Sequence, residues 1–520
     1  MSDGVSTRPT KDRRERFLSN VLWSWAGVAF NLVIGFVLSP YVIHKLGADG
    51  YGAWALLFSL IGYYGLLDLG FKSALVRYSA YFKASGEAEK INELINTIMF
   101  YYGLCSLVLF GISLVLAHYA NRIFHVAPAF QHDFSVLVVL TGINFIIGMN
   151  VFAGCLEGFQ RFDISTRIYV ATLAVRSVGA LVLLWLGYKL LALGINLLAA
   201  QVLSLVLGWY AFRKIFPALR FGMKYVSRSV LRQTASYGAH TFVAMVAGHS
   251  LSQGVSLLIA FFLPASFVGY YALPSRLLQY TVDLVERVGF VSASTASELA
   301  AHGDKQSIAR LGMYSNRYSF AMFMPLTIFL LAYGREFLNV WVGPNFAVFS
   351  APILPILLVG TAVAIAGQFN SGAILFGMAR HREYSRGLAV ETAANLVGML
   401  IVIPRYGIFG AAVLSTALML LVRGLYTPWL VCRSLDFSLM RYLRSIFLAP
   451  SLAALPIIAL AFWHKHRSAV VHTWPGLAEV GLTITVLYFV IAFFICAEPE
   501  HRQLLLKRLP LKSAATNRAG

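Results

Sequence analysis

Charged side chains interrupt the long apolar runs of this sequence at a small number of positions. In the run 51–76, Asp68 and Lys72 lie four residues apart, and Asp283 and Arg287 repeat that spacing in the run 267–291. Residues four apart share one face of a helix, so each acid could pair with its base. A charge at the centre of a membrane helix costs about 2.5–3.5 kcal/mol on insertion scales, and it usually faces the protein interior or a wet cavity. Such residues are candidates for binding an anion or carrying an ion.

Basic side chains inside apolar runs are the candidates for an anion-binding cavity. Arginine suits a phosphate because its planar guanidinium contacts two oxygens at once. Two readings stay open for the bases that have an acid four residues away, since they either bind substrate or form ion pairs that make insertion tolerable. Lys72 and Arg287 could also reach the membrane interface. Candidate cavity residues, including polar uncharged ones, are Arg276, Arg176, Arg287, Lys72, Arg423, Asn31, His249 and Gln253.

Three carboxyl groups inside the apolar runs are candidates for ion coupling, namely Asp68, Asp283 and Glu391. A carboxyl group in apolar surroundings binds its proton more tightly than in water, so it could take up H⁺ on one side and release it on the other. Na⁺ is the other candidate ion. The alternative interpretation is that these carboxylates form structural ion pairs. Transport would also need no coupling ion if the membrane potential drives an anionic substrate outward, since each charge gains about 2.3 kcal/mol per 100 mV.

The composition indicates what must position these residues. The 520-residue chain is 58% hydrophobic and 12% charged, whereas soluble chains average about 25% charged residues. This excludes a soluble enzyme, a disordered protein and a nucleic-acid binder, and it predicts an all-α polytopic membrane protein. Since a span needs about 20 apolar residues, we predict about 14 transmembrane helices, near 18–42, 51–76, 91–117, 134–157, 167–187, 190–212, 236–262, 267–291, 314–333, 350–376, 387–403, 408–431, 443–463 and 476–497.

The net charge of +20 is distributed unevenly between the predicted loops. With the N-terminus placed in the cytoplasm, 30 of the 42 Lys and Arg residues lie in or beside cytoplasmic segments, and 7 lie in external loops. The positive-inside rule therefore predicts that both termini are cytoplasmic. An even number of spans agrees with this topology.

An internal repeat divides the spans into two sets of six. The shift that superimposes Gly52 on Gly269 also superimposes Gly86-Glu87 on Gly303-Asp304, and a slightly longer shift superimposes Gly158 on Gly377. Six spans per repeat give both copies the same orientation, as in some secondary transporters. We predict a basic cytoplasmic N-terminus, two pseudo-symmetric six-helix lobes, an appended C-terminal helix pair and a basic cytoplasmic tail, with boundaries 1–17, 18–232, 233–433, 434–497 and 498–520.

Several activities lack support in the sequence. The loops are too short for a soluble domain, and no nucleotide-binding P-loop motif occurs. The four cysteines, Cys105, Cys155, Cys432 and Cys496, are isolated and show no metal-ligand spacing. We therefore predict a transporter and not an enzyme, with no cofactor, no metal and no nucleic-acid partner.

Three stretches resemble the polysaccharide biosynthesis (polysaccharide transport) family, which includes O-antigen flippases and belongs to the multidrug/oligosaccharidyl-lipid/polysaccharide superfamily. They are 46–54 (LGADGYGAW) leading into 65–70 (GLLDLG), 156–161 (LEGFQR), and 334–338 (GREFL) with 341–343 (WVG). The resemblance covers most of the chain.

The resemblance implies a flippase of the bacterial inner membrane. It would carry an undecaprenyl pyrophosphate-linked oligosaccharide from the inner to the outer leaflet by alternating access, for O-antigen, capsule or exopolysaccharide synthesis. Its expected partners are that substrate, membrane lipids and the polymerase or chain-length proteins of the pathway. Two alternatives remain open, a cation-coupled multidrug exporter of the same superfamily and a membrane glycosyltransferase or ligase. The short external loops weigh against the last.

Overall fold

The computed structural model describes residues 10–68, 70–148, 150–467 and 471–508. Within these ranges, side chains are described except at 10–30, 66–67, 148, 235–245, 247–248, 251–252, 284, 287–288, 290–291, 381 and 504–508. In the described ranges the ordered elements are helices and no strand occurs, which confirms the all-α prediction. The longer helices are α1 (Thr10–Tyr64), α2 (Phe71–Ala84), α3 (Ala88–Ile123), α4 (Gln131–Gly148), α5 (Val151–Gly158), α6 (Phe162–Trp185), α7 (Leu190–Ile215), α8 (Arg228–Phe262), α9 (Ala265–Ala301), α10 (Lys305–Val342), α12 (Leu354–Gly367), α13 (Phe369–Gly377), α14 (His381–Leu418), α15 (Thr427–Leu435), α16 (Leu439–Arg467), α17 (Trp474–Ile495) and α18 (Pro499–Arg508).

Ten segments of the described chain are long and apolar enough to cross a membrane. They are Asn31–Tyr64, Ala88–Ile123, Pro128–Gly158, Phe162–Trp185, Leu190–Ile215, Lys305–Val342, Leu354–Gly377, Arg382–Leu435, Leu439–Arg467 and Trp474–Ile495. The polytopic membrane architecture is therefore confirmed, while the number fourteen stays a prediction.

The segment Arg382–Leu435 contains two of the predicted spans. Gly407 interrupts α14 with a φ of 58°, in the left-handed region that glycine adopts without steric cost. The helical segments before and after Gly407 pack against each other, and Asn395 Nδ2 donates to Ser415 Oγ across them over 3.2 Å. A Cβ at Gly398 would lie 2.6 Å from Leu414. The segment is thus a helical hairpin, as the spans 387–403 and 408–431 predict.

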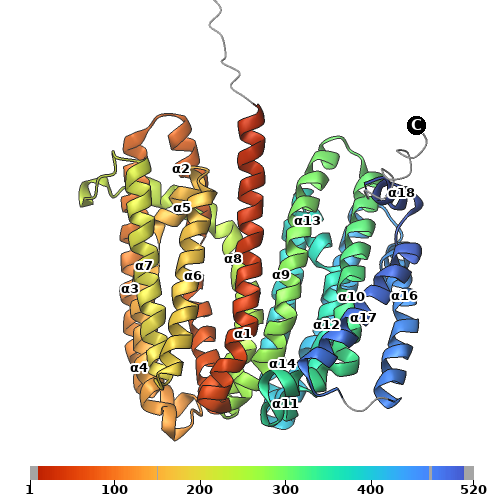
Figure 1. Ribbon diagram of the computed structural model, residues 1–520. Helices are drawn as coiled ribbons and strands as arrows, with labels where there is room; N and C mark the ends of the chain where they lie inside the picture. Colours follow the sequence, from red (N-terminus) through yellow and green to blue (C-terminus); the bar gives the residue numbers. More distant parts are fainter. Residues whose placement is uncertain (1–9, 69, 149, 468–470, 509–520) are drawn as a thin grey trace, which may run out of the picture. The chain divides into compact units, whose positions relative to one another are not determined.

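The chain forms two compact units, one up to Gly269 and one from Tyr270 onward. In the first unit, α3 packs on α4, α6 on α7, α4 on α7 and α2 on α5 (Figure 1). This unit contains an apolar core of buried side chains, which include Phe82, Phe159, Phe212, Leu219 and Val230. The predicted lobe boundary at 232/233 comes from the internal repeat. The two compact units instead divide after Gly269, so that α8 belongs to the first unit. The predicted boundary stays a proposal.

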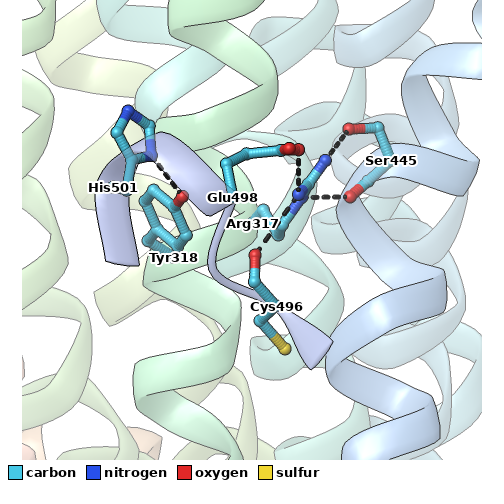
Figure 2. A network of polar contacts seen from close by, with 6 residues as sticks. All are labelled: Arg317, Tyr318, Ser445, Cys496, Glu498 and His501. Atoms are coloured by element: carbon cyan, nitrogen blue, oxygen red, sulfur yellow. Dashed lines mark hydrogen bonds and ion pairs between the residues drawn. The ribbon is translucent and has the colours of Figure 1, made fainter. Parts of the chain in front are cut away.

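In the second unit, α10 packs against α12, α13, α15, α16 and α17. The C-terminal pair α16 and α17, predicted as an appended hairpin, is fixed to α10 at one end by Arg317, which is 13% exposed in its side chain. Arg317 Nε donates to Ser445 O over 2.7 Å, and its Nη1 contacts Glu498 Oε1 over 2.9 Å (Figure 2). The neighbouring Tyr318 hydroxyl and His501 Nδ1, at the start of α18, are 2.6 Å apart.

The opposite end of α10 holds the same hairpin through a second set of contacts. Tyr333 donates its hydroxyl to Ala461 O over 3.0 Å. Lys465, in the last turn of α16, lies 2.9 Å from the buried carboxylate of Glu336. The two ends of α10 therefore hold α16 at both of its termini.

The predicted repeat has the same local geometry in both copies. Gly86 and Gly303, which the repeat superimposes, have φ values of 74° and 71°. The residues that follow them, Glu87 and Asp304, have φ/ψ of −87°/73° and −81°/75°. Both turns close with a backbone bond from the latter residue to the carbonyl five positions earlier, Phe82 or Leu299.

A second pair of equivalent turns joins α5 to α6 and α13 to α14. Gln160 and Ala379 occupy the left-handed region with φ of 62° and 59°, although neither is glycine. The glycine that ends the preceding helix packs closely in both copies. A Cβ would lie 2.0 Å from Ser79 Oγ at Gly158 and 2.4 Å from Ala293 O at Gly377.

Candidate substrate and coupling sites

The expected pairing of Asp68 with Lys72 is not the one that forms. A 3₁₀ turn ends at Asp68 and α2 begins at Phe71, with Gly70 in the left-handed region between them. Because the helix is broken there, spacing by four no longer places the two side chains on one face. Lys72 lies 3.3 Å from Glu157 Oε1 in α5, and Asp68 accepts a hydrogen bond from the Tyr102 hydroxyl of α3.

The other candidates in the first unit are distributed over three helices. Arg176 is half-buried in α6, and its carbonyl accepts from Asn196 Nδ2 over 2.6 Å. Asn31 in α1 and His249 in α8 are half-buried. Gln253 packs so closely on α1 that a Cβ at Gly62 would lie 2.8 Å from its Cγ. The described contacts do not bring these residues into one cluster.

In the second unit, α9 has a polar stripe. Arg276 is exposed and donates its Nε to the Tyr280 hydroxyl over 3.2 Å. One turn further, Gln279 Nε2 donates to Asp283 Oδ1 over 2.9 Å. The side chain of Arg287 lies outside the described residues, so its predicted pairing with Asp283 stays a prediction.

The most buried charges among the described candidates are Glu391 in α14 and Arg423. Arg423 Nε lies 2.8 Å from Glu391 Oε1, and their side chains are 11% and 1% exposed. Each charge is a separate candidate in the sequence, and the hairpin around Gly407 brings the two together. The two charges neutralise each other, so in this arrangement Arg423 is paired with a carboxylate of the protein.

Arg423 of this pair lies on an irregular stretch of helix. Met419–Tyr426 forms a π-helix, a conformation that is rare and frequent at functional sites. A Cβ at Gly367 in α12 would lie 2.4 Å from the Arg423 carbonyl, and one at Gly387 would lie 2.4 Å from the Tyr426 ring. Glycines at both positions allow the helices to approach the widened turn that carries Arg423.

Two residues that the sequence did not single out lie in the same part of the second unit, Asn395 one turn after Glu391 in α14 and Gln368 next to Gly367. Glu391 Oε2, Gln368 Oε1 and Asn395 Oδ1 are buried oxygens for which the described residues supply no hydrogen-bond donor. Gln368 Nε2 donates to the Tyr384 hydroxyl over 2.9 Å. Buried acceptors without a donor carry a large desolvation cost. Each of the three oxygens could accept a hydrogen bond from water or contact a small cation, and of the three only the Glu391 carboxylate could take up a proton. Sequence reasoning named the neutral Asn31 and Gln253 but missed Gln368 and Asn395, because no local pattern distinguishes these two from other neutral side chains in apolar runs.

Comparison with known proteins decides the family. The family described as polysaccharide biosynthesis protein matches residues 17–293, more than half of the chain. The chain belongs to this family. The sequence resemblance is thereby confirmed.

Relatives by sequence cover most of the chain. An "Uncharacterized membrane protein EpsK" of Bacillus subtilis is 24% identical over 92% of this chain and 95% of its own length. A "Putative O-antigen transporter" of Shigella flexneri is 21% identical over 80% of this chain and 98% of its own length. A "Probable low-salt glycan biosynthesis flippase" of Haloferax volcanii is 24% identical over 75% of this chain and 78% of its own length.

Solved structures show the fold. The lipid II flippase MurJ in an inward closed conformation superposes with a TM-score of 0.70 at 12% identity, over 92% of this chain and 98% of that one. An inward-facing multidrug resistance transporter of the MATE family superposes with a TM-score of 0.63 at 12% identity, over 79% and 95%. The names of these relatives and structures agree with the prediction of a transporter in place of an enzyme.

Proposed function

We propose that the protein is a flippase that moves an isoprenoid pyrophosphate-linked oligosaccharide from the cytoplasmic to the outer leaflet of a bacterial plasma membrane. The observation that carries the proposal is membership of the polysaccharide biosynthesis family, joined to relatives named for O-antigen transport and glycan flipping. The flippase-like fold extends over nearly the whole chain.

The physical need for such a protein follows from the substrate. An oligosaccharide has many hydroxyl groups, and each would lose its hydrogen bonds to water in hydrocarbon. The chain has intramembrane polar residues with which to replace some of those bonds. Arg276, exposed on α9 of the second unit, is the base that we assign to the pyrophosphate, since a guanidinium group contacts phosphate at two oxygens, and Arg176 in the first unit stays a separate candidate.

We assign the coupling role, if an ion drives transport, to Glu391 in preference to Asp68 and Asp283. Glu391 is the most buried of the three carboxylates, and its Oε2 lacks a donor among the described residues. Asp68 accepts from Tyr102 and Asp283 from Gln279. Arg423 then acts as the group that holds the carboxylate when it carries no ion.

We also propose that both termini are cytoplasmic. In the first unit, contacts at the α2–α3 turn and at the start of α3 hold together the three loops that are predicted to face the cytoplasm. Lys83 at the α2–α3 turn donates to Phe159 O at the α5–α6 turn over 3.2 Å. The segment after α7 is bound to the start of α3 through Asn92. Basic loops gathered at one end are what the positive-inside rule requires.

The test is the fate of lipid-linked sugars in a strain that lacks the gene. We expect a finished isoprenoid-linked oligosaccharide to accumulate on the cytoplasmic face, and the wild-type gene to restore its normal level. The face is measured by enzymatic or periodate labelling of sealed vesicles of known orientation. An absence of any accumulated intermediate, together with higher sensitivity to cationic dyes, would support the multidrug-exporter alternative, whose fold the chain shares.

A further inference from the structure

The segment that joins α7 to α8, residues 216–227, is bound to α3 by an unusual set of amide contacts. Asn92 Nδ2 donates to Ala218 O over 3.0 Å, and its Oδ1 accepts from Arg220 N over 2.9 Å. Asn96 repeats the pattern one turn on, donating to Arg220 O over 2.8 Å and accepting from Gly222 N over 3.0 Å. Each amide therefore uses both of its ends on the backbone of this segment, which we call the α7–α8 linker.

A third contact closes the linker. Ser227 N donates to Thr97 Oγ1 over 2.9 Å, next to Asn96 in α3. Asn92, Asn96 and Thr97 are all buried. The backbone of the linker is consequently a fixed part of the first unit from Ala218 to Ser227, and Figure 1 draws it as the yellow-green segment that follows α7 in the chain.

The linker exposes two apolar side chains. Met223 is 70% exposed, and Phe221 is 47% exposed while its ring also contacts the buried Phe152 edge-on, with 6.4 Å between the ring centroids. Basic residues flank them, since Arg220 and Lys224 are exposed on either side. Lys224 also lies over the ring of Tyr225, with its Nζ 5.1 Å from the centroid.

The end of α7 continues the same pattern. Lys214 lies 4.6 Å from the Tyr210 ring centroid and Arg213 lies 5.9 Å from that of Trp209. Trp and Tyr concentrate at the level of lipid headgroups, and clustered Lys and Arg next to a membrane span attract anionic lipids. Aromatic, apolar and basic groups therefore lie together where α7 leaves the membrane.

We propose that the α7–α8 linker is a membrane-surface anchor that inserts Met223 and Phe221 into the cytoplasmic leaflet and binds anionic phospholipid headgroups through Arg220 and Lys224. The leaflet assignment rests on the proposed topology, in which this linker is cytoplasmic. We infer that the ligand is an anionic lipid because the two exposed charged residues of the linker, Arg220 and Lys224, are both positive. The anchor would fix the first unit at a set depth through the Asn92 and Asn96 contacts.

The experiment places an environment-sensitive fluorophore on the full-length chain in lipid nanodiscs. Met223→Cys is labelled with a nitrobenzoxadiazole dye in a Cys105→Ala background, since Cys155, Cys432 and Cys496 are buried. The matched control is Gln306→Cys, an exposed position at the start of α10 on the same predicted side. We expect blue-shifted emission and quenching by nitroxide-labelled lipids at 223, and neither at 306.

Lipid composition tests the charge argument. In nanodiscs that contain phosphatidylglycerol, the inserted fraction at 223 should exceed that in pure phosphatidylcholine. Arg220→Gln with Lys224→Gln should remove this difference, because each cation near an anionic surface contributes about fivefold to the partition ratio. The result that overturns the proposal is a 223 probe that behaves like the 306 probe in both lipids.

A protein partner is the competing occupant. It would leave the 223 probe aqueous in nanodiscs and shift it only in native membrane vesicles, which contradicts a lipid anchor. These readouts need no transport, so a failure of the flippase proposal would not mimic a failure of the anchor.

Discussion

At the scale of single residues, the Glu391–Arg423 pair is the most deeply buried ion pair among the described residues. Removing one partner of a buried ion pair leaves the other charge desolvated and uncompensated, which typically costs about 3–5 kcal/mol. Replacing both partners by neutral groups that bond to each other avoids that cost. Single and double variants therefore separate the value of the pair from the cost of an isolated charge.

We expect Arg423→Gln alone to destabilise the purified protein by about 3–5 kcal/mol. The double variant with Glu391→Gln should recover most of this loss, because both charges are gone and the two amides can bond across the 2.8 Å contact. Thermal unfolding in detergent measures both. Arg433→Gln, at an exposed site over Trp429, is the control and should have little effect. An additive double variant would contradict a coupled pair.

The same double variant tests the coupling role of Glu391. If the carboxyl group carries the ion, the folded double variant should still bind substrate, but its transport in reconstituted vesicles should no longer respond to an imposed H⁺ or Na⁺ gradient. Arg433→Gln should keep the wild-type response. An unchanged gradient dependence in the double variant would assign coupling to another carboxylate, with Asp283 and Asp68 next to be tested.

The assignment of Arg276 to the pyrophosphate has a separate test. Arg276→Ala should reduce export of lipid-linked sugar severalfold while the amount of protein in the membrane stays unchanged, because the side chain is exposed and contributes little to packing. Arg276→Lys should recover part of the activity, since the charge returns without the bidentate geometry. Normal export in the alanine variant, with protein levels matched by immunoblot, would remove Arg276 from the site.

At the scale of helices and turns, the internal repeat is visible as conformation as well as sequence. Gly158 and Gly377 end equivalent helices, and a Cβ at either would meet equivalent atoms of α2 or α9. The neighbours are Val76 and Ser79 in the first copy, and Ala293 and Ala296 in the second. The two shifts found in the sequence therefore describe one packing arrangement used twice. A glycine is required at each position because two helices touch there.

We expect Gly158→Ala and Gly377→Ala to destabilise the protein by similar amounts, about 1–3 kcal/mol each, since an added methyl group must displace a neighbouring helix. Gly103→Ala is the control, because no atom of a neighbouring helix lies within 4 Å of the added Cβ. Thermal unfolding of the three variants under one condition makes the comparison. A loss confined to one copy would show that the two turns are not mechanically equivalent.

At the scale of the whole molecule, the sequence was sufficient for features that depend on composition and period. Long apolar runs predicted the all-α membrane architecture, and glycine-containing turns predicted the repeat. Pairings between helices were not predictable, because they depend on packing that no local pattern encodes. Lys72 pairs with Glu157 across α2 and α5 in place of Asp68, and the Gly70 break that separates Asp68 from Lys72 has no signal beyond a glycine. Arg423 and Glu391 meet only because Gly407 folds their helices together.

The orientation of the protein in the membrane affects all of these proposals. The direction of substrate movement, the linker anchor and the coupling scheme each depend on which ends of the helices are cytoplasmic. Gln306, in the first turn of α10, and His466, in the last turn of α16, are both exposed. They belong to opposite ends of the second unit, since Lys305 contacts Asp436 before α16 whereas Lys465 contacts Glu336 near the end of α10. Cysteines placed at both positions in the Cys105→Ala background should therefore label differently. In intact spheroplasts a membrane-impermeant maleimide should modify His466→Cys at once and Gln306→Cys only after permeabilisation. The reverse pattern would place the termini outside, and it would require the basic loops to face away from the compartment that the positive-inside rule assigns to them.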